Sequence, residues 1–312
     1  MVASAAALSE QHLWAPSSGG TSVAVHELAG TDGPDHDRVL IAHATGFHAR
    51  AYLPVATGLT PRFHTFGFDA RGHGDTAAPP GWAVEWTGYG DDALAAAEEV
   101  AAGPQSEQTK QGERLIGFGH SMGGALLLMA AHRAPRLFGL LVLFEPIVYP
   151  PVDPAAEPPP PGPLPAGARR RRRTFPSIEE AVAHYGSRPP LDAFDPEALD
   201  AYVRYGFTPD DEGVRLKCEP QHEAATFEQG RIHRTWDLLA DIQTPVVVAS
   251  GRIEDASPAE IAEAIAERLP LGRYVAMPEL DHFGPFTHPA LVADLVATSV
   301  HELDELDDHG SP

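Results

Sequence analysis

The sequence has almost no cysteine, no long apolar run and few basic residues. Cys218 is the one cysteine among the 312 residues, so no disulfide can form within the chain and no thiolate metal cluster can be built. No stretch of about 18 apolar residues is present, which excludes the usual pattern of a membrane-spanning helix. The N-terminal segment MVASAAALSEQHLW has no basic region ahead of an apolar core, so we expect no secretory signal.

Acidic residues outnumber basic ones two to one. There are 44 Asp and Glu against 22 Lys and Arg, and the formal net charge is −22 at pH 7. Nucleic acids and anionic membranes bind basic surfaces, so we expect neither as a partner. We expect a cytoplasmic, reduced protein whose partner is a small-molecule substrate. The sequence leaves open whether the chain forms a homo-oligomer.

Short apolar runs alternate with helical segments along most of the chain. The expected strands cover residues 22–28, 39–42, 63–68, 114–118, 140–144, 245–250 and about 273–276. The expected helices cover residues 87–102, 121–134, 258–269 and about 288–306. Runs without strict alternation, separated by helices, are typical of a parallel sheet covered on both faces. The sequence therefore predicts an α/β fold with a mostly parallel central sheet.

Residues 150–235 interrupt this alternation. They begin with PPVDPAAEPPPPGPLPAG, in which proline removes the backbone donors that a helix or an inner strand needs. Five arginines, Arg169 to Arg173, and helical pieces follow, without a clean strand. We expect a proline-rich connector and a helical cap here, inserted between two parts of the core, residues 1–149 and 236–312.

The stretch GFGHSMGGALLLMAAH places a serine between a strand and a helix. Gly119, Ser121 and Gly123 form a G-x-S-x-G pattern. A nucleophilic serine needs a sharp turn that projects its oxygen into a cleft, and glycine tolerates the resulting crowding of the backbone. The N-terminus of the following helix can stabilise an oxyanion. The pattern predicts that Ser121 is a nucleophile; the alternative is a plain glycine-rich turn.

A serine nucleophile needs a base, and the base needs an orienting acid. In this architecture the order along the chain is Ser, then Asp or Glu, then His. His282 lies in PELDHFGPFTHP, between a short strand and the last helix, and is the candidate base. The alternative for His282 is a solvated loop histidine. We expect His288 to start a helix, and His120 to point away from the nucleophile and pack.

Three carboxylates are candidates for the acid. Glu254 and Asp255 lie in GRIEDASPAE, which leaves the carboxyl end of the strand at 245–250, the usual place for this residue. We favour Glu254 over Asp255. Glu145 in LVLFEPIV, at the end of the preceding strand, could also reach the histidine. Its alternative role is to anchor the cap hinge through backbone hydrogen bonds.

Two backbone N–H groups are expected to form an oxyanion hole. One belongs to Met122, which follows the nucleophile. The second should come from the loop HATGF, residues 43–47, which follows the strand at 39–42. We choose Thr45 as this donor; the alternative is that HATGF is only a turn.

Together these motifs resemble the α/β-hydrolase superfamily. The resemblance rests on HATGF, FDARGHGDT, GHSMGG, GRIEDASP and DHFGP, and covers about residues 20–145 and 240–305. It implies cofactor-free hydrolysis through an acyl-enzyme, with no metal. It also implies structural roles for residues of the FDARGHGDT loop: Asp69, Arg71, His73 and Gly74. The sequence departs from the family pattern at Ala44, where glycine is usual, and at Glu254, where aspartate is commoner.

A serine at the elbow limits the chemistry to attack on an acyl carbon. Haloalkane and epoxide opening are disfavoured, because those relatives attack with an aspartate. We expect a serine esterase that cleaves a carboxylic ester or lactone of a small, apolar or aromatic substrate. The alternatives are an acyltransferase or thioesterase with the same triad, or a non-catalytic ligand-binding or signalling protein with this fold.

Two features of the expected cap have open roles. Its aromatic residues could line an acyl pocket or form the core of the cap: Phe175, Tyr185, Phe194, Tyr202, Tyr205, Phe207, Phe227 and Trp236. The arginine run could attract an anionic substrate, or it could be a solvated or acid-paired face.

Overall fold

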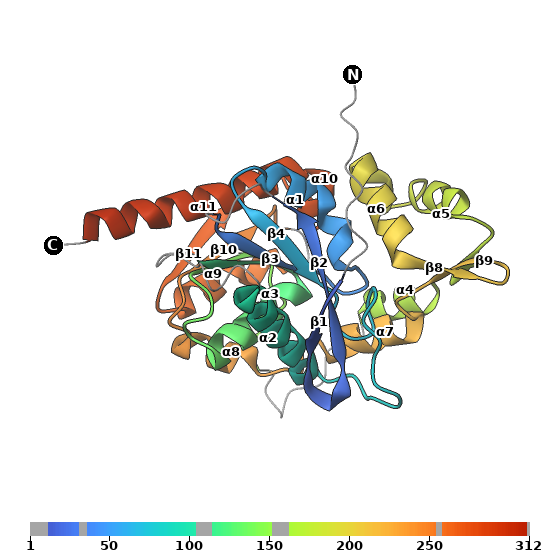
Figure 1. Cartoon of the computed structure of the whole chain (residues 1–312), viewed down its shortest axis with the longest axis horizontal. Coiled ribbons are helices and arrows are strands. Elements are labelled where there is room, and N and C mark those ends of the chain that lie inside the picture. Colours follow the sequence, from blue (N-terminus) through green and yellow to red (C-terminus); the bar gives the residue numbers. More distant parts are fainter. Residues whose placement is uncertain (1–11, 31–35, 104–113, 152–161, 254–257, 311–312) are drawn as a thin grey trace, which may run out of the picture.

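The computed structural model describes residues 12–30, 36–103, 114–151, 162–253 and 258–310. Eight strands of this part form a central sheet in the order β1-β2-β4-β3-β5-β6-β10-β11 (Figure 1). The strands are β1 (Leu13–Pro16), β2 (Ser22–Ala29), β3 (Arg38–Ala42), β4 (His64–Phe68), β5 (Leu115–His120), β6 (Leu140–Phe144), β10 (Val246–Ser250) and β11 (Gly272–Ala276). Pairing is antiparallel among β1, β2 and β4, and parallel from β4 through to β11.

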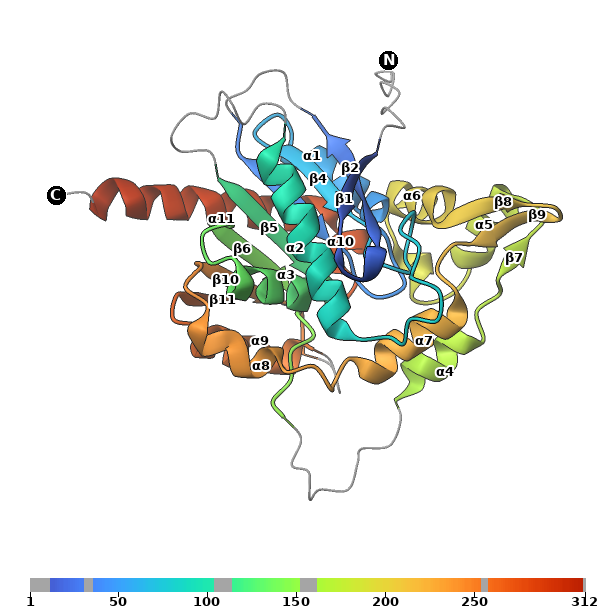
Figure 2. The same cartoon turned by 60° about the horizontal axis from the view of Figure 1, so that its bottom comes forward.

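Helices cover both faces of this sheet (Figure 2). One face packs against α2 (Trp86–Ala102), α3 (Met122–Arg133) and α9 (Ala259–Arg268). The other packs against α1 (Leu53–Leu59) and α11 (Pro289–Gly310). Because both faces are covered, strands such as LLVLF of β6 and VVVAS of β10 are buried at every position. The fold is therefore the α/β-hydrolase architecture predicted from the alternation of apolar runs and helices.

A smaller unit, residues 163–229, packs beside the sheet, and we call it the cap. It contains four helices of the described chain: α4 (Pro163–Arg169), α5 (Ile178–Tyr185), α6 (Pro196–Gly206) and α7 (Pro220–Gln229). It also contains a three-stranded sheet in the order β7-β9-β8, formed by β7 (Thr174–Phe175), β9 (Gly213–Leu216) and β8 (Phe207–Asp210). The sequence did not predict these strands, because they are short and only partly buried.

The strands and helices predicted from the sequence are all present. The edge strand β1 was missed, and its burial explains this, since Trp14 is exposed and only Ala15 of the strand is buried. Three short helices were also missed: α1 (Leu53–Leu59), α8 (Thr235–Leu238) and α10 (Gly284–Thr287). The helix α4 begins inside the proline-rich stretch, which was expected to form no helix; its prolines Pro163 and Pro165 lie in the first turn, where no backbone donor is needed. Among the described residues, no helix is both long and apolar enough to span a membrane.

Candidate functional site

Ser121 lies in the sharp turn between β5 and α3. Its backbone has φ 55° and ψ −114°, an unusual conformation for a residue with a side chain. A Cβ atom on Gly123 would lie 2.0 Å from the carbonyl oxygen of Ala42, and one on Gly119 would lie 2.7 Å from the Cα of Gly124. The glycines are therefore required because the turn forces neighbouring backbones together, which is the reason inferred from the sequence.

His282 is held by a buried carboxylate. Its Nδ1–H donates to Oε2 of Glu145 over 2.7 Å. The Glu145 side chain is 0% exposed, whereas that of His282 is 28% exposed. A carboxylate on Nδ1 fixes the ring orientation and leaves Nε2 as the acceptor of a proton.

Glu145 is positioned by the end of β6. Its backbone N–H continues the parallel ladder by donating to the carbonyl of Ala249, 2.9 Å away, and its φ is 45°. Its Oε1 accepts the backbone N–H of Gly251 over 2.9 Å. The second oxygen is thereby directed to His282, so β6 and β10 together hold the carboxylate.

The favoured acid, Glu254, and its neighbour Asp255 lie outside the described residues. The carboxylate found on Nδ1 of His282 is the third candidate, Glu145. The sequence contained a signal for this position, because Glu145 directly follows a strand of apolar residues only, and a buried carboxylate requires a partner.

The loop that carries His282, residues 277–284, is fixed against the end of β10. The backbone N–H of Arg252 donates to the carbonyl of Leu280 over 2.8 Å. A Cβ atom on Gly251 would lie 2.6 Å from that same carbonyl oxygen, so the two loops are in close contact. The Asp281 carboxylate accepts the N–H of Phe283 over 2.8 Å and so caps the turn after His282.

His282 also lies against the turn that carries Ser121. The ring centroids of His120 and His282 are 5.0 Å apart, and Nε2–H of His120 donates to the carbonyl of His282 over 2.9 Å. Within the described part, the hydroxyl of Ser121 forms no hydrogen bond with the His282 ring. Such bonds are often long in ligand-free enzymes and shorten when substrate binds.

The expected oxyanion donors lie at the two predicted turns. Met122 begins α3, where the first backbone N–H groups have no partner within the helix. Thr45 is buried in the 43–47 loop, next to Gly46 with φ 79°. Among the described residues, neither of these two N–H groups has a hydrogen-bond acceptor, which leaves both available to an oxyanion.

The cap packs against both the 43–47 loop and the segment after His282. Phe47 stacks on Phe286, with ring centroids 4.4 Å apart, and lies 4.9 Å from Tyr202 of α6. The backbone N–H of Asp195 donates to the carbonyl of Phe286 over 2.8 Å. These contacts join the cap to the two loops on either side of Ser121.

Two further contacts of the cap are made with the 43–47 loop and with His48, the residue that follows it. Nε2–H of His48 donates to the carbonyl of Tyr202 over 3.0 Å, and burial lowers the pKa of His48 to about 4. The Glu223 carboxylate lies so close to Gly46 that a Cβ there would be 2.6 Å from Oε1. His48 and Glu223 could not be singled out from the sequence, because only the tertiary fold brings them to this loop.

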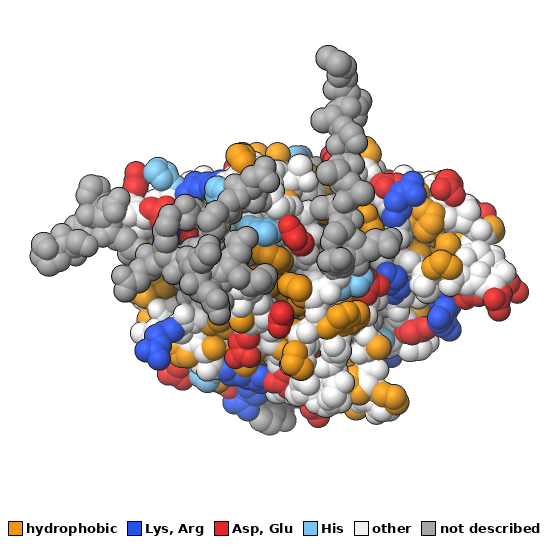
Figure 3. Space-filling model, in the orientation of Figure 1, with side chains coloured by type: hydrophobic (Ala, Val, Ile, Leu, Met, Phe, Trp, Pro, Cys, Tyr) orange, Lys and Arg blue, Asp and Glu red, His pale blue; other side chains and the backbone are white. Residues whose placement is uncertain are grey.

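The open roles of the cap residues are partly resolved. Four of the eight aromatic residues are buried in an apolar cluster and build the core of the cap: Phe175, Phe194, Tyr202 and Phe207. Four of the five arginines pair with glutamates, as in an acid-paired face: Arg169 with Glu228, Arg171 with Glu223, Arg172 with Glu180 and Arg173 with Glu219. On the face shown in Figure 3, described basic side chains are interspersed with acidic ones.

The aspartate of the FDARGHGDT loop has the structural role that the resemblance implied. Its carboxylate accepts Nε2–H of His26 and the backbone N–H groups of Ala49 and Asp75, each over 2.8 Å. Burial would raise the pKa of Asp69, but His26 and neighbouring histidines hold it well below its usual range. Gly74 has φ 49°, and a Cβ there would lie 2.1 Å from the Asp69 carboxylate.

Arg71 of the same loop forms a buried ion pair with α2. Its Nε and backbone N–H donate to Oδ2 of Asp92, each over 2.9 Å, and its Nη2 donates to Oδ1 over 2.6 Å. The hydroxyl of Ser17 donates to the same carboxylate over 2.7 Å. This network joins the loop, α2 and the segment after β1.

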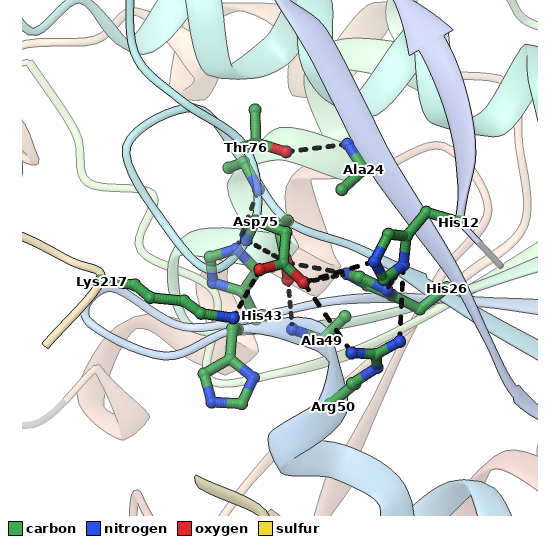
Figure 4. Close-up of polar contacts among 12 residues, drawn as sticks. His12, Ala24, His26, His43, Ala49, Arg50, Asp75, Thr76 and Lys217 are labelled. Atoms are coloured by element: carbon green, nitrogen blue, oxygen red, sulfur yellow. Dashed lines mark hydrogen bonds and ion pairs between the residues drawn. The ribbon is translucent and has the colours of Figure 1, made fainter. Parts of the chain in front are cut away.

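One group of described residues has the donor set of a metal site. His12, His26 and Asp75 offer ligand atoms within 4.8 Å of one another (Figure 4). However, Nζ of Lys217 lies 2.5 Å from one Asp75 oxygen, and Nη1 of Arg50 lies 3.8 Å from the other. These cations already balance the carboxylate and would repel a divalent ion. The cluster therefore acts as an ion-pair network that links the cap, through Lys217, to the core.

A cleft of about 470 Å³ lies beside this network. It is formed by the 72–78 loop and by β8, β9 and the start of α7 in the cap. Its two cations, Lys217 and Arg215, are paired with Asp75 and Glu219. Of the described candidate catalytic residues, Ser121, His282 and Glu145 do not line it.

Sequence comparison places the chain in a family. The profile of the alpha/beta hydrolase family matches residues 39–295, which include the Ser121 turn, Glu145 and His282. The chain belongs to this family. Its described sheet, helices and sharp turn after β5 have the architecture that the family requires.

Individual relatives are distant. A type I acyl-CoA thioesterase (mpaH) of Penicillium roqueforti is 27% identical over 172 residues, which are 54% of this chain and 36% of the relative. The chain spans less than half the length of the curated relatives it matches.

Solved structures share the fold along nearly the whole chain. E-2-(acetamidomethylene)succinate hydrolase has a TM-score of 0.70 at 20% identity, covering 93% of this chain and 100% of that one. A thermophilic esterase from Thermogutta terrifontis has a TM-score of 0.65 at 19% identity, covering 94% and 99%.

Proposed function

We propose that the chain is a serine hydrolase that cleaves an acyl bond with Ser121, His282 and Glu145. The observation that carries this proposal is the buried Glu145 carboxylate on Nδ1 of a histidine that packs against the serine turn. A carboxylate buried this completely is costly unless it serves a partner, and here the partner is an imidazole that is partly open to solvent.

The reaction follows from the roles of these groups. Ser121 Oγ attacks the acyl carbon, while its proton passes to Nε2 of His282. Glu145 stabilises the imidazolium that forms, and the N–H groups of Thr45 and Met122 stabilise the oxyanion. His282 then gives its proton to the leaving oxygen, and a water molecule, activated by the same imidazole, releases the acid from Ser121. No metal or cofactor takes part in these steps.

We assign the acid of the proposed triad to Glu145 and not to Glu254, which the sequence favoured. Its two oxygens are engaged by His282 and by the N–H of Gly251, and this fixes the carboxylate in one orientation. The two strands that hold it, β6 and β10, are buried at every position, whereas the conventional acid position lies in the loop after β10.

The substrate is a carboxylic ester or lactone with a small, apolar or aromatic group. Phe47 of the 43–47 loop, an aromatic residue that is only partly buried, supports an apolar acyl environment. A thioester is the second candidate, favoured by the similarity to the Penicillium acyl-CoA thioesterase.

The test is hydrolysis of short p-nitrophenyl esters and short acyl-CoA thioesters, with fluorophosphonate labelling of Ser121. We expect turnover by the wild-type chain, and loss of several orders of magnitude in both Ser121→Ala and His282→Ala. The double variant should be about as impaired as either single variant, because the two residues act as a unit. Absence of both turnover and labelling in the folded wild-type chain would favour a non-catalytic binding protein instead.

A further inference from the structure

A chain of three hydrogen bonds runs beneath the serine turn. The backbone N–H of Ala44 donates to the hydroxyl oxygen of Tyr52 over 3.0 Å. The Tyr52 hydroxyl is 2.8 Å from Nδ1 of His120, and Nε2 of His120 is 2.9 Å from the carbonyl oxygen of His282. This series of hydrogen bonds begins at Ala44, next to Thr45. It passes through His120, the residue before Ser121, and ends on the backbone of His282.

The direction of these hydrogen bonds is determined by their ends. The carbonyl of His282 can only accept, so Nε2 of His120 carries the proton. In a neutral imidazole Nδ1 is then an acceptor, and the Tyr52 hydroxyl donates to it. Burial is the main cause that lowers the pKa of His120 well below its ordinary value, and the nearby His282 ring lowers it further. This agrees with a neutral His120 ring. Each of the three hydrogen bonds therefore has one assigned donor and one assigned acceptor.

The surroundings make this arrangement rigid. Tyr52 and His120 are both fully buried. Phe286 packs against both rings, with centroids 4.8 Å from Tyr52 and 5.7 Å from His120. In such an apolar environment, the loss of one hydrogen bond leaves a buried donor or acceptor without a partner. The hydrogen-bonded series therefore resists distortion.

We propose that Tyr52 and His120 are positioning residues that fix the 43–47 loop and the His282 loop relative to each other on either side of Ser121. This inference rests on the proposed function. The oxyanion donor and the base must both lie within a few tenths of an ångström of their working positions, and a shift of about 1 Å can cost 10²-fold in rate. Neither residue touches the substrate, so their effect is on the transition state and not on substrate binding.

A pair of tyrosine variants tests the proposal. Tyr52→Phe removes the central hydroxyl, and Tyr89→Phe is the matched control. Tyr89 of α2 is also fully buried, and its hydroxyl bonds to Thr226 and His222 of α7 over 2.7 and 3.0 Å. We expect similar losses of thermal stability in both variants. Only Tyr52→Phe should lower kcat, by about tenfold, with KM unchanged within about twofold.

Two substitutions of His120 separate its two hydrogen bonds. The amide nitrogen of His120→Gln can occupy the place of Nε2 and still donate to the His282 carbonyl. The shorter His120→Asn reaches only the place of Nδ1. We expect kcat of the glutamine variant to stay within about threefold of wild type, and that of the asparagine variant to fall by tenfold or more. Their melting temperatures should be similar.

The outcomes distinguish this inference from the proposed function. If wild type turns over esters but Tyr52→Phe loses no more activity than Tyr89→Phe, the positioning role is wrong and the serine hydrolase remains. Equal losses in His120→Gln and His120→Asn would also overturn it. If the folded wild-type chain neither turns over esters nor labels at Ser121, the proposed function fails, and the positioning role fails with it.

Discussion

At the scale of single residues, the site depends on two side chains in strained backbone positions. Ser121 and Glu145 are the non-glycine residues with positive φ in the described part of the chain. Each follows directly after a buried strand, β5 or β6, and these strands are neighbours in the sheet. Such conformations cost of order 1–3 kcal/mol each and persist where the surrounding structure holds them. Here the hydrogen bonds of the adjacent strands hold both residues.

Glu145 is the proposed acid, and removal of its charge should lower the activity. Glu145→Gln retains the shape of the side chain but removes its charge, so the imidazolium that forms during acylation loses its stabilising partner. We expect kcat/KM to fall by about 10³-fold or more. Glu254→Gln and Asp255→Asn should each change it by less than about threefold. A larger loss in Glu254→Gln than in Glu145→Gln would return the acid role to the loop after β10.

The sequence analysis named Ser121 and His282 as candidate nucleophile and base, and the structure brings the His282 loop against the Ser121 turn. The carboxylate on Nδ1 of His282 is Glu145, not the favoured Glu254. Ser121 and His282 stand in local patterns of glycine and loop residues, and these patterns are readable without knowledge of the fold. Glu145 reaches His282 across 137 positions of sequence, through the pairing of β6 with β10. Only a prediction of which strands are neighbours could have given it priority over Glu254.

At the scale of elements, the predictions succeeded where burial is nearly complete. β6 and β10 are apolar at almost every position because both faces of the parallel sheet are covered. The strands of the cap have mixed burial, with Phe207 buried and Pro209 exposed, so that no alternation is visible in the sequence. The buried ion pair by which Asp92 joins α2 to Arg71 of the 69–76 loop could not be predicted either.

The buried ion pair of Arg71 and Asp92 should stabilise the contact between the 69–76 loop and α2. Asp92→Asn leaves Arg71 as a buried charge without its counterion, while the volume of the side chain stays the same. We expect a loss of about 3–5 kcal/mol in the free energy of unfolding, measured by urea denaturation. Asp200→Asn is the control, because its i,i+4 pair with Arg204 is exposed and contributes less than about 0.5 kcal/mol. Equal effects of the two substitutions would contradict the structural role of the buried pair.

At the scale of the whole molecule, the cap and the core are joined by a buried histidine and by a partly exposed ion pair. His48 of the core bonds to the backbone of α6 in the cap, while Lys217 of the cap pairs with Asp75 of the core. The apolar cluster on the α1 and α11 face of the sheet continues into the cap through Phe194, Tyr202 and Phe207. The cap and core therefore share one hydrophobic interior on this side.

The pH dependence of stability follows from His48. The unfolded chain binds a proton at this residue near pH 6.5, whereas burial lowers its pKa in the folded state to about 4. The unfolded state therefore binds more protons between these values, and stability decreases as the pH falls from about 6.5 to about 4. His48 should account for about 3 kcal/mol of this decrease.

Thermal unfolding measured across this pH range checks the prediction. His48→Gln keeps a donor for the Tyr202 carbonyl but cannot be protonated, so its stability should depend less on pH than that of wild type. His301→Gln, at an exposed position of α11, should leave the pH dependence unchanged. The same slope in the His48 variant and in wild type would show that the buried histidine does not titrate as described.

The position of Glu145, the proposed acid, at the end of β6 has a consequence for how the sequence of this protein can vary in evolution. In a hydrolase whose acid follows β10, insertions or deletions in that connection displace a catalytic group and are selected against. With Glu145 as the proposed acid, the connection after Gly251 carries no catalytic group, while the backbone N–H of Gly251 still braces Glu145. Homologues that retain a glutamate at the end of β6 should therefore show frequent length variation immediately beyond this glycine, and a foreign peptide grafted there should leave ester hydrolysis intact.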